Sequence, residues 1–213
     1  MSKIASVADS PVETIGGVAY RLRTATCYDL PKMRWRLTRA RVRRPTIDEY
    51  RVCALAGVAA IAELAGAPEE GRVQADILER WYELLPVPTE DEIEEVDADR
   101  RAALLAEQLA ERRAAMDAIL PSVLAIEANL DRHWQDWAEL RADAQMYDDV
   151  SRIDAARLML VAVGDDMLPR VADGDEQGLV TEAAFLAIPA AARAALGTIA
   201  LGRLAPSETE RKN

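Results

Sequence analysis

The sequence predicts a mainly α-helical protein, in which a short N-terminal β-hairpin is followed by a multi-helix bundle with long, kinked helices. Three observations lead to this prediction. The stretch VETIGGVAYRLR at residues 12–23 alternates with period two around a two-residue Gly-Gly turn, as a hairpin does. Elsewhere alanine dominates the apolar residues and only 5% of residues are aromatic, a composition typical of helices. Apolar residues also recur at heptad spacing from Leu105 to Tyr147.

Capping signals predict the helices that follow the hairpin. A first helix begins at Asp29, which we interpret as its N-cap. A second begins at the capping box Thr46–Glu49 and stops at Gly66. A third follows Pro68 and ends at the Pro-Val-Pro sequence of residues 86–88.

The heptad pattern predicts a long helical seam after a second capping box, Thr89–Glu92, which opens an acidic first turn. The seam is apolar except at Arg112 and His133. Pro121 lies inside it and removes a backbone hydrogen bond, so we expect a kink or short break near residues 117–121. The seam positions are Leu105, Leu109, Arg112, Met116, Ile119, Val123, Ile126, Leu130, His133, Trp137, Leu140, Ala144 and Tyr147.

The remaining chain is predicted to form short helices and a loop. Ser151 is interpreted as the cap of a short helix that stops at Gly164. The sequence DGDEQG at residues 173–178 indicates a surface loop. Residues 181–203 predict two short helical pieces, divided at Ile188-Pro189.

Charge divides the chain unevenly. Residues 21–44 hold nine Lys or Arg and one acid, a net charge of +8, whereas the residues after 44 carry −18 of a chain total of −11. We therefore expect an N-terminal hairpin and basic helical module (residues 1–66), an acidic helical body (67–204) and a flexible tail (205–213). The opposite charges are expected to attract each other, within the fold or between subunits.

The residues that commonly carry chemistry form no catalytic arrangement. His133 is the single histidine and lies on an apolar seam, where we expect it to pack. Cys27 and Cys53 are too far apart in sequence for a metal knuckle and are interpreted as ordinary thiols. The 173–178 loop is no EF-hand, because its twelfth position is Ala184 and not a bidentate Glu. We expect no enzyme, no cofactor and no metal site. With no secretory signal or membrane-spanning run in the sequence, we expect a soluble protein that is not exported.

One face of the first helix is basic. Lys32, Arg36, Arg39 and Arg43 lie on the side opposite its apolar stripe, with Trp35 beside them. Such a face could neutralise phosphates and stack on bases, but the acidic remainder of the chain argues against nucleic acid as the partner. The alternatives are self-association or a protein client.

The centre of the seam has two interpretations. It forms either the internal core of a helical hairpin or a groove for a partner's helix. In either case we expect five residues to contact a partner or to support the contact from beneath: Met116, Ile119, Val123, Ile126 and Leu130.

Four stretches carry a resemblance to a known family. They are GGVAYRLR, TATCYDLPKMRWRL, LDRHWQDWAELRADAQMYDDVSRIDAARLMLVAVG and LGRLAPSETERKN. Together they resemble small tail assembly proteins of long-tailed phages, prophages and gene transfer agents, commonly assigned as tail assembly chaperones. The resemblance implies a non-enzymatic factor in the cytoplasm of a bacterial host, which binds the helical tape-measure protein before the tail is complete. It also implies that the hairpin and the basic helix are a recognition or oligomerisation module.

Two other functions fit the same features. One is a minor structural component of the virion, such as a tail or connector protein. The other is a nucleic-acid-binding regulator that uses the basic helix 29–44. Gene order would separate the regulator from the two phage functions, and the composition of purified particles would separate the chaperone from the virion component.

Overall fold

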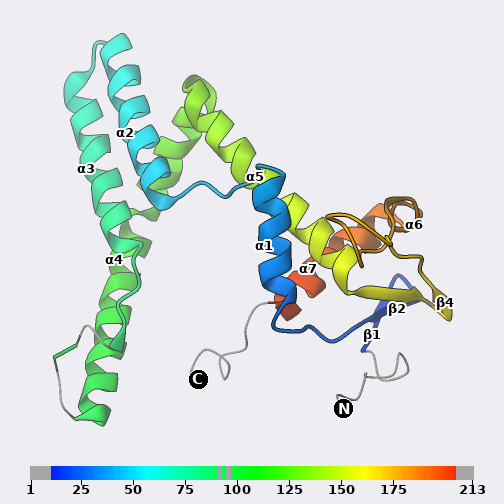
Figure 1. Ribbon diagram of the computed structural model, residues 1–213. Helices are drawn as coiled ribbons and strands as arrows, with labels where there is room; N and C mark the ends of the chain where they lie inside the picture. The colour runs from blue at the N-terminus through cyan, green and yellow to red at the C-terminus, as the bar shows by residue number, and fades with distance from the viewer. Residues whose placement is uncertain (1–10, 91–92, 95–96, 205–213) are drawn as a thin grey trace. The chain divides into compact units, whose positions relative to one another are not determined.

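The computed structural model describes residues 11–90, 93–94 and 97–204, and it confirms a mainly α-helical chain with an N-terminal hairpin (Figure 1). The predicted flexible tail, residues 205–213, lies outside the described residues. Within them, the helices are α1 (Asp29–Arg39), α2 (Ile47–Leu64), α3 (Pro68–Leu84), α4 (Ala98–His133), α5 (Gln135–Met159), α6 (Glu182–Leu186) and α7 (Ala190–Leu204). The strands are β1 (Val12–Ile15), β2 (Val18–Leu22), β3 (Leu160–Val163) and β4 (Asp166–Met167).

The chain divides into two compact units. Unit 1 consists of residues 1–44 and 143–213, and unit 2 of residues 45–142. This division differs from the boundary predicted after residue 66, because the basic N-terminal module is joined to the C-terminal part of the chain. Strand β2 pairs with β3, more than 130 residues later in the sequence.

The period-two stretch near the N-terminus forms the expected hairpin. Strands β1 and β2 are antiparallel, and Ile15 opposite Val18 closes the turn. Gly16 and Gly17 have φ values of 58° and 82°, a backbone conformation that glycine adopts without steric cost. One side of β2 is buried, which gives the hairpin the apolar support that an isolated hairpin lacks.

The hairpin is part of a larger sheet that the sequence did not predict. Within the described residues the sheet has the order β1-β2-β3-β4 and every pair is antiparallel. The prediction of a capped helix from Ser151 to Gly164 was wrong in both of its ends. Ser151 is buried inside α5, and the helix gives way at residue 160 to β3, which ends at a turn with Gly164 at φ 58°.

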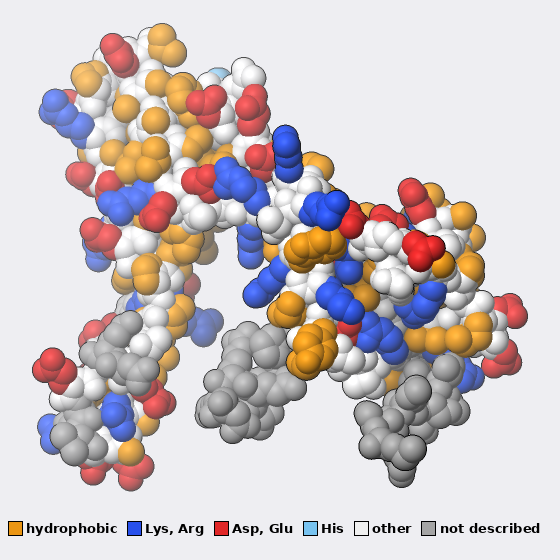
Figure 2. Space-filling view, in the orientation of Figure 1, with side chains coloured by type: hydrophobic (Ala, Val, Ile, Leu, Met, Phe, Trp, Pro, Cys, Tyr) orange, Lys and Arg blue, Asp and Glu red, His pale blue; other side chains and the backbone are white. Residues whose placement is uncertain are grey.

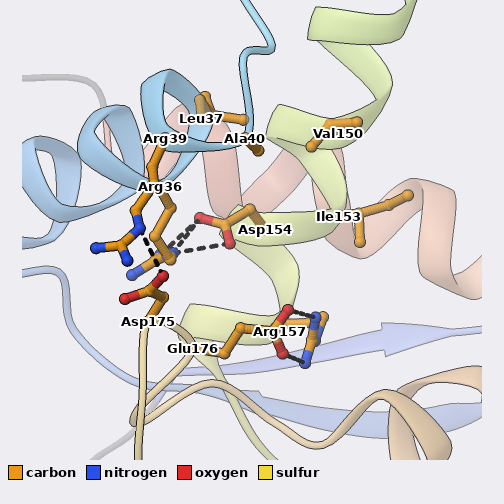
Figure 3. Close-up of a pocket in the computed structure, with 10 residues that line it drawn as sticks. All are labelled: Arg36, Leu37, Arg39, Ala40, Val150, Ile153, Asp154, Arg157, Asp175 and Glu176. Atoms are coloured by element: carbon orange, nitrogen blue, oxygen red, sulfur yellow. Dashed lines mark hydrogen bonds and ion pairs between the residues drawn. The ribbon is translucent and has the colours of Figure 1, made fainter.

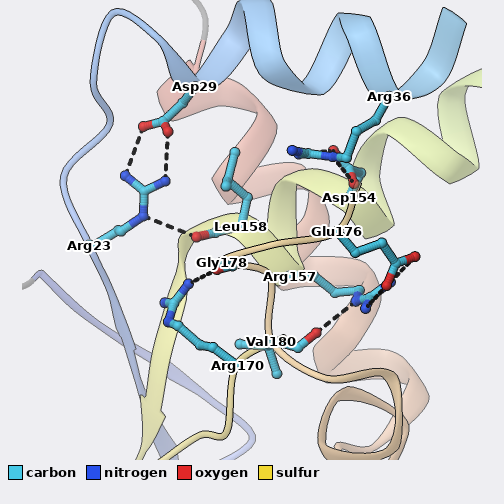
Figure 4. Close-up of polar contacts among 10 residues, drawn as sticks. All are labelled: Arg23, Asp29, Arg36, Asp154, Arg157, Leu158, Arg170, Glu176, Gly178 and Val180. Atoms are coloured by element: carbon cyan, nitrogen blue, oxygen red, sulfur yellow. Dashed lines mark hydrogen bonds and ion pairs between the residues drawn. The ribbon is translucent and has the colours of Figure 1, made fainter. Parts of the chain in front are cut away.

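Asp29 does not have its predicted role as an N-cap. It is the first residue of α1, and its buried carboxylate accepts hydrogen bonds from Arg23 Nη1 and Nη2, both at 2.7 Å (Figure 4). It also accepts one from the Thr26 N–H at 2.6 Å. Arg23 Nε also donates to the Leu158 carbonyl at 3.1 Å. This cluster therefore joins the end of β2, the start of α1 and the end of α5.

The predicted 173–178 loop is present, and two arginines hold the segment around it. Arg157 Nε donates to the Val180 carbonyl at 2.9 Å, and Arg170 Nη2 donates to the Leu160 carbonyl at 2.6 Å. Arg170 also donates to the Gly178 carbonyl (Figure 4). Backbone groups of the loop and of β3 thus find partners that regular secondary structure does not supply.

Unit 2 begins with two helices that lie side by side, α2 and α3 (Figure 1). The predicted capping box is confirmed: Thr46 Oγ1 accepts from the Glu49 N–H at 3.2 Å, and Glu49 Oε2 accepts from the Thr46 N–H at 2.8 Å. The helices approach closely at Gly71, where an added Cβ would lie 2.4 Å from that of Ala62. Residue Gly66, with φ 69°, follows α2 as predicted.

Helix α4 differs from its prediction at both ends. It begins at Ala98 and not at Thr89, with Asp97 Oδ1 accepting from the Arg100 N–H; Glu92 of the predicted capping box lies outside the described residues. The helix is continuous through Pro121, so of the predicted kink or short break the break is absent. The chain instead leaves the helical conformation at Trp134, which has φ −124° and ψ 104°.

The close contact between α7 and α5 gives a testable stability difference. A Cβ added at Gly197 would lie 2.8 Å from the Arg152 Cβ and 3.0 Å from its carbonyl oxygen, whereas one added at Gly202 would meet nothing within 4 Å. We expect Gly197→Ala to lower the free energy of unfolding by about 1–2 kcal/mol despite its better helix propensity. The control Gly202→Ala is expected to raise it by up to about 1 kcal/mol. Urea unfolding followed by circular dichroism measures both, and equal stabilisation by the two variants would contradict the close contact.

Candidate functional site

The centre of the predicted seam lies in the core of unit 2. Val123, Ile126 and Leu130 are 1%, 5% and 0% exposed, and they belong to one cluster with Val58 of α2 and Leu78 of α3. The interpretation of these positions as internal core is therefore the one that the structure favours. They can support a partner contact from beneath, but they present almost no surface of their own.

Toward its N-terminus the same face of α4 opens into a groove with a volume of about 340 Å³. We call it the α4 groove. Met116 is the one predicted partner-binding residue that lines it, while Ile119 packs at the edge of the core. Trp81 of α3 and Leu120 were not predicted as site residues. The lining residues are Trp81, Leu109, Arg112, Arg113, Met116, Asp117 and Leu120.

Arg112 explains why one seam position is polar. Its Nε donates to the Leu84 carbonyl at 2.5 Å and its Nη2 to the Leu85 carbonyl at 2.9 Å. These carbonyls belong to the last turn of α3, where helix geometry leaves acceptors without partners. Arg112 therefore fixes the wall of the groove that carries Trp81.

The predicted basic face is divided by the fold. Arg36 makes a two-pronged ion pair with Asp154 of α5, with Nε–Oδ1 at 3.0 Å and Nη2–Oδ2 at 2.6 Å (Figure 3). Only 10% of its side chain is exposed. Arg39 pairs with Asp175 at 2.9 Å, but its side chain stays 62% exposed. Part of the expected attraction between basic and acidic segments thus occurs within unit 1.

These pairs border a cavity of about 390 Å³ between α1, α5 and the 173–178 loop (Figure 3). Arg157 also lines the cavity and forms an ion pair with Glu176, with Nη2–Oε2 at 2.7 Å. The hydrogen bond from Arg157 holds the pKa of the Glu176 carboxyl below its ordinary value, so that the pair is ionised at neutral pH. The cations that line this cavity are therefore matched by carboxylates, and the cavity offers no unbalanced charge to a ligand.

Four exposed residues along α1 form what we call the α1 stripe: Tyr28, Lys32, Trp35 and Arg39, the last of which also borders the cavity. Tyr28 is 70% and Trp35 50% exposed, and Lys32 is exposed as well. The Arg39 guanidinium lies 5.3 Å from the centre of the Trp35 ring, within the range of a cation–π contact. Figure 2 shows basic and apolar side chains next to each other on this face. Arg43, the remaining predicted residue of the basic face, is exposed but does not lie on the helix: α1 ends at Arg39 and not at residue 44 as predicted, because the chain turns at Arg41 with φ 58°.

The single histidine and the two cysteines do not come together in a shared site in the described part of the chain. His133 was predicted to pack on the seam, but it is exposed, because the helix ends there. Burial raises the pKa of the Cys53 thiol, which disfavours the reactive thiolate. Cys27 is exposed, and neither cysteine forms a disulfide. Among residues 11–90, 93–94 and 97–204, no three His, Cys, Asp or Glu side chains gather as a metal site would need.

The two units carry opposite net charges. With Lys and Arg counted as +1 and Asp and Glu as −1, the residues of unit 1 sum to +2 and those of unit 2 to −13, which together give the chain total of −11. The α4 groove therefore belongs to the strongly acidic unit, and the α1 stripe to the weakly basic one.

Comparison of the chain with protein-family models, curated proteins and solved structures gives no match. In the described part of the chain, no helix is both long and apolar enough to cross a lipid bilayer.

Proposed function

We propose that the chain is a non-enzymatic tail assembly factor of a phage or prophage, a chaperone that binds the helical tape-measure protein during tail morphogenesis. The proposal draws its biological setting from the resemblance of stretches such as GGVAYRLR and LGRLAPSETERKN to tail assembly proteins. It places the action in the cytoplasm of the bacterial host, before the tail is complete.

The observation that supports this function best is the α4 groove. Trp81, Leu109, Met116 and Leu120 offer an apolar floor on a helical surface, and amphipathic helices bind such grooves through residues spaced one turn apart. The charged side chains of Arg113 and Asp117 line the groove beside this floor. A long helical client could bury exposed apolar side chains in the groove, and this binding requires no chemical step.

The groove lies next to the packed core of unit 2 along α4. Met116 and Ile119 are followed on the same helix by Val123 and Ile126, which are nearly inaccessible to solvent. A contact surface that continues into a packed core changes shape little on binding. The groove therefore loses less conformational entropy when a client helix binds.

A binding measurement on the groove tests this function. We expect a labelled synthetic amphipathic segment of the tape-measure protein to bind the full chain, with fluorescence anisotropy as the readout. Met116→Glu should weaken binding about thirtyfold, the loss typical of a buried anchor at an interface. Ala118→Glu adds the same charge at an exposed position on the same helix, outside the groove lining, and should leave binding unchanged.

Two results would oppose the proposal. Equal binding by the Met116 and Ala118 variants would remove the groove from the contact. Detection of the chain as a stoichiometric component of purified phage particles would favour a structural virion protein over an assembly factor.

A further inference from the structure

The α1 stripe is exposed along its length, and its Arg39 end carries the exposed ion pair with Asp175. Its four residues follow one another at intervals of four, three and four, so their side chains lie in one line along α1. Aromatic and cationic side chains alternate along this line. Such a surface attracts a segment that combines carboxylates with aliphatic side chains.

The same chain contains a segment of that composition. Residues 90–99 hold seven acids and no Lys or Arg, together with Ile93 and Val96. Among its described residues, Glu90 and Glu94 are exposed. The acids are Glu90, Asp91, Glu92, Glu94, Glu95, Asp97 and Asp99.

We propose that the α1 stripe of one copy binds the 90–99 segment of a second copy. Lys32 and Arg39 would face its carboxylates, and Tyr28 and Trp35 its aliphatic side chains. The ion pair between Arg39 and Asp175 does not prevent this, because both side chains are about half exposed or more and a pair of that kind contributes little. The contact joins a segment of the unit with charge −13 to a surface of the unit with charge +2.

A second copy explains the stripe better than a nucleic acid does. A long polyanion would be repelled by a chain whose net charge is −11. Arg36, the neighbouring cation, is already matched by Asp154. An acidic segment of limited length needs only the two cations of the line, Lys32 and Arg39, with Trp35 between them.

The contact joins two different surfaces, so it is heterologous. Each copy has one stripe and one acidic segment, so it can hold two neighbours, which gives rings or open chains, or exchange both contacts with one neighbour, which gives a reciprocal dimer. The small size of the stripe makes the association weak, and the exposed charges make it sensitive to salt.

Sedimentation velocity of the full chain tests the proposal. We expect the average mass to rise with protein concentration up to about 200 µM, and to rise less in about 500 mM NaCl than in about 50 mM, where exposed charges are screened less. The stripe variant, Lys32→Glu with Trp35→Ala, and the acidic-segment variant, Glu90→Lys with Glu94→Lys, should each stay monomeric. All four substituted side chains are exposed, so thermal unfolding curves should match the wild type.

Mixing the two variants gives the sharpest outcome. One competent stripe and one competent segment remain in the mixture, so it should form a dimer and nothing larger. A control with the same charge change elsewhere on α4, Glu107→Lys with Glu111→Lys, should associate as the wild type does, because both residues are exposed outside the segment.

A wild-type chain that stays monomeric at the highest concentration would overturn the proposal. So would association that both variants retain. If the wild type binds a labelled thymidine 20-mer at about 150 mM salt, and the stripe variant loses only that binding, the stripe belongs to a nucleic acid and not to a second copy.

Discussion

Replacing Ile126 by Asp is expected to cost about 4–5 kcal/mol and to unfold unit 2 or leave it barely stable. Ile126 is 5% exposed and packs in a hydrophobic cluster with residues of α2, α3 and α4, where a carboxylate would lose its hydration. Because small domains unfold with a free energy of about 5–15 kcal/mol, this loss takes a large part of the total. Urea unfolding of the full chain measures it.

The matched control is Leu124→Asp, two residues earlier on the same helix. Leu124 is 54% exposed, so its carboxylate would stay hydrated, and we expect a change of less than about 1 kcal/mol. If Ile126→Asp unfolds at the same urea concentration as the wild type, the seam is not the core of unit 2.

Replacing Asp29 by Ala is expected to destabilise unit 1 by about 3 kcal/mol. The substitution removes three short hydrogen bonds and leaves the Arg23 guanidinium and the Thr26 N–H without their acceptor. The control Asp165→Ala removes a fully exposed carboxylate, whose Oδ1 lies 3.3 Å from Arg21 Nη2 in a single surface ion pair. This substitution should leave the unfolding midpoint unchanged. Equal effects of the two substitutions would contradict a structural role for Asp29.

The cost of Asp29→Ala should depend on pH. Burial by itself would raise the pKa of Asp29, but the hydrogen bonds from Arg23 and Thr26 outweigh it and hold the pKa below the ordinary value of 3.8. A carboxyl with a lowered pKa stabilises the fold above its unfolded pKa, and that contribution disappears as the pH falls through the folded pKa. The difference in stability between wild type and variant should therefore be constant near neutral pH and shrink below 3.8.

Sequence patterns predicted well those elements whose signals are local. The capping box at Thr46, the stop at Gly66 and the Gly-Gly hairpin each depend on residues a few positions apart, and all three are present. The start of α4 was misplaced because Thr89 and Asp97 both precede acidic turns, and local rules do not decide between two such caps.

Features that depend on distant pairing were missed. The run LVAV at residues 160–163 is apolar throughout, so its period does not separate a buried strand from a helix. Only its pairing with β2 makes it a strand, and the same pairing carries the C-terminal segment into unit 1.

The candidate site was predicted only in part, because local patterns do not show which residues from distant parts of the chain come together. Met116 lies on the heptad seam and was found, whereas Trp81 and Leu120 reach the α4 groove from another helix and from outside the seam. On α1 the helical period placed Lys32, Arg36 and Arg39 away from the buried Met33 and Leu37, but α1 ends at Arg39, so Arg43 does not share its face. The period could not show that Arg36 would be matched by Asp154, 118 residues later in the chain.

Co-expression with the tape-measure protein encoded beside this chain tests the central claim most directly. The measured quantity is the amount of tape-measure protein that stays soluble and is captured with the tagged chain. We expect the wild type and Ala118→Glu to keep the tape-measure protein soluble and bound, and Met116→Glu to lose it while remaining folded. A tape-measure protein that is equally soluble without the chain, or that the wild type neither captures nor solubilises, would contradict a role in holding its helices.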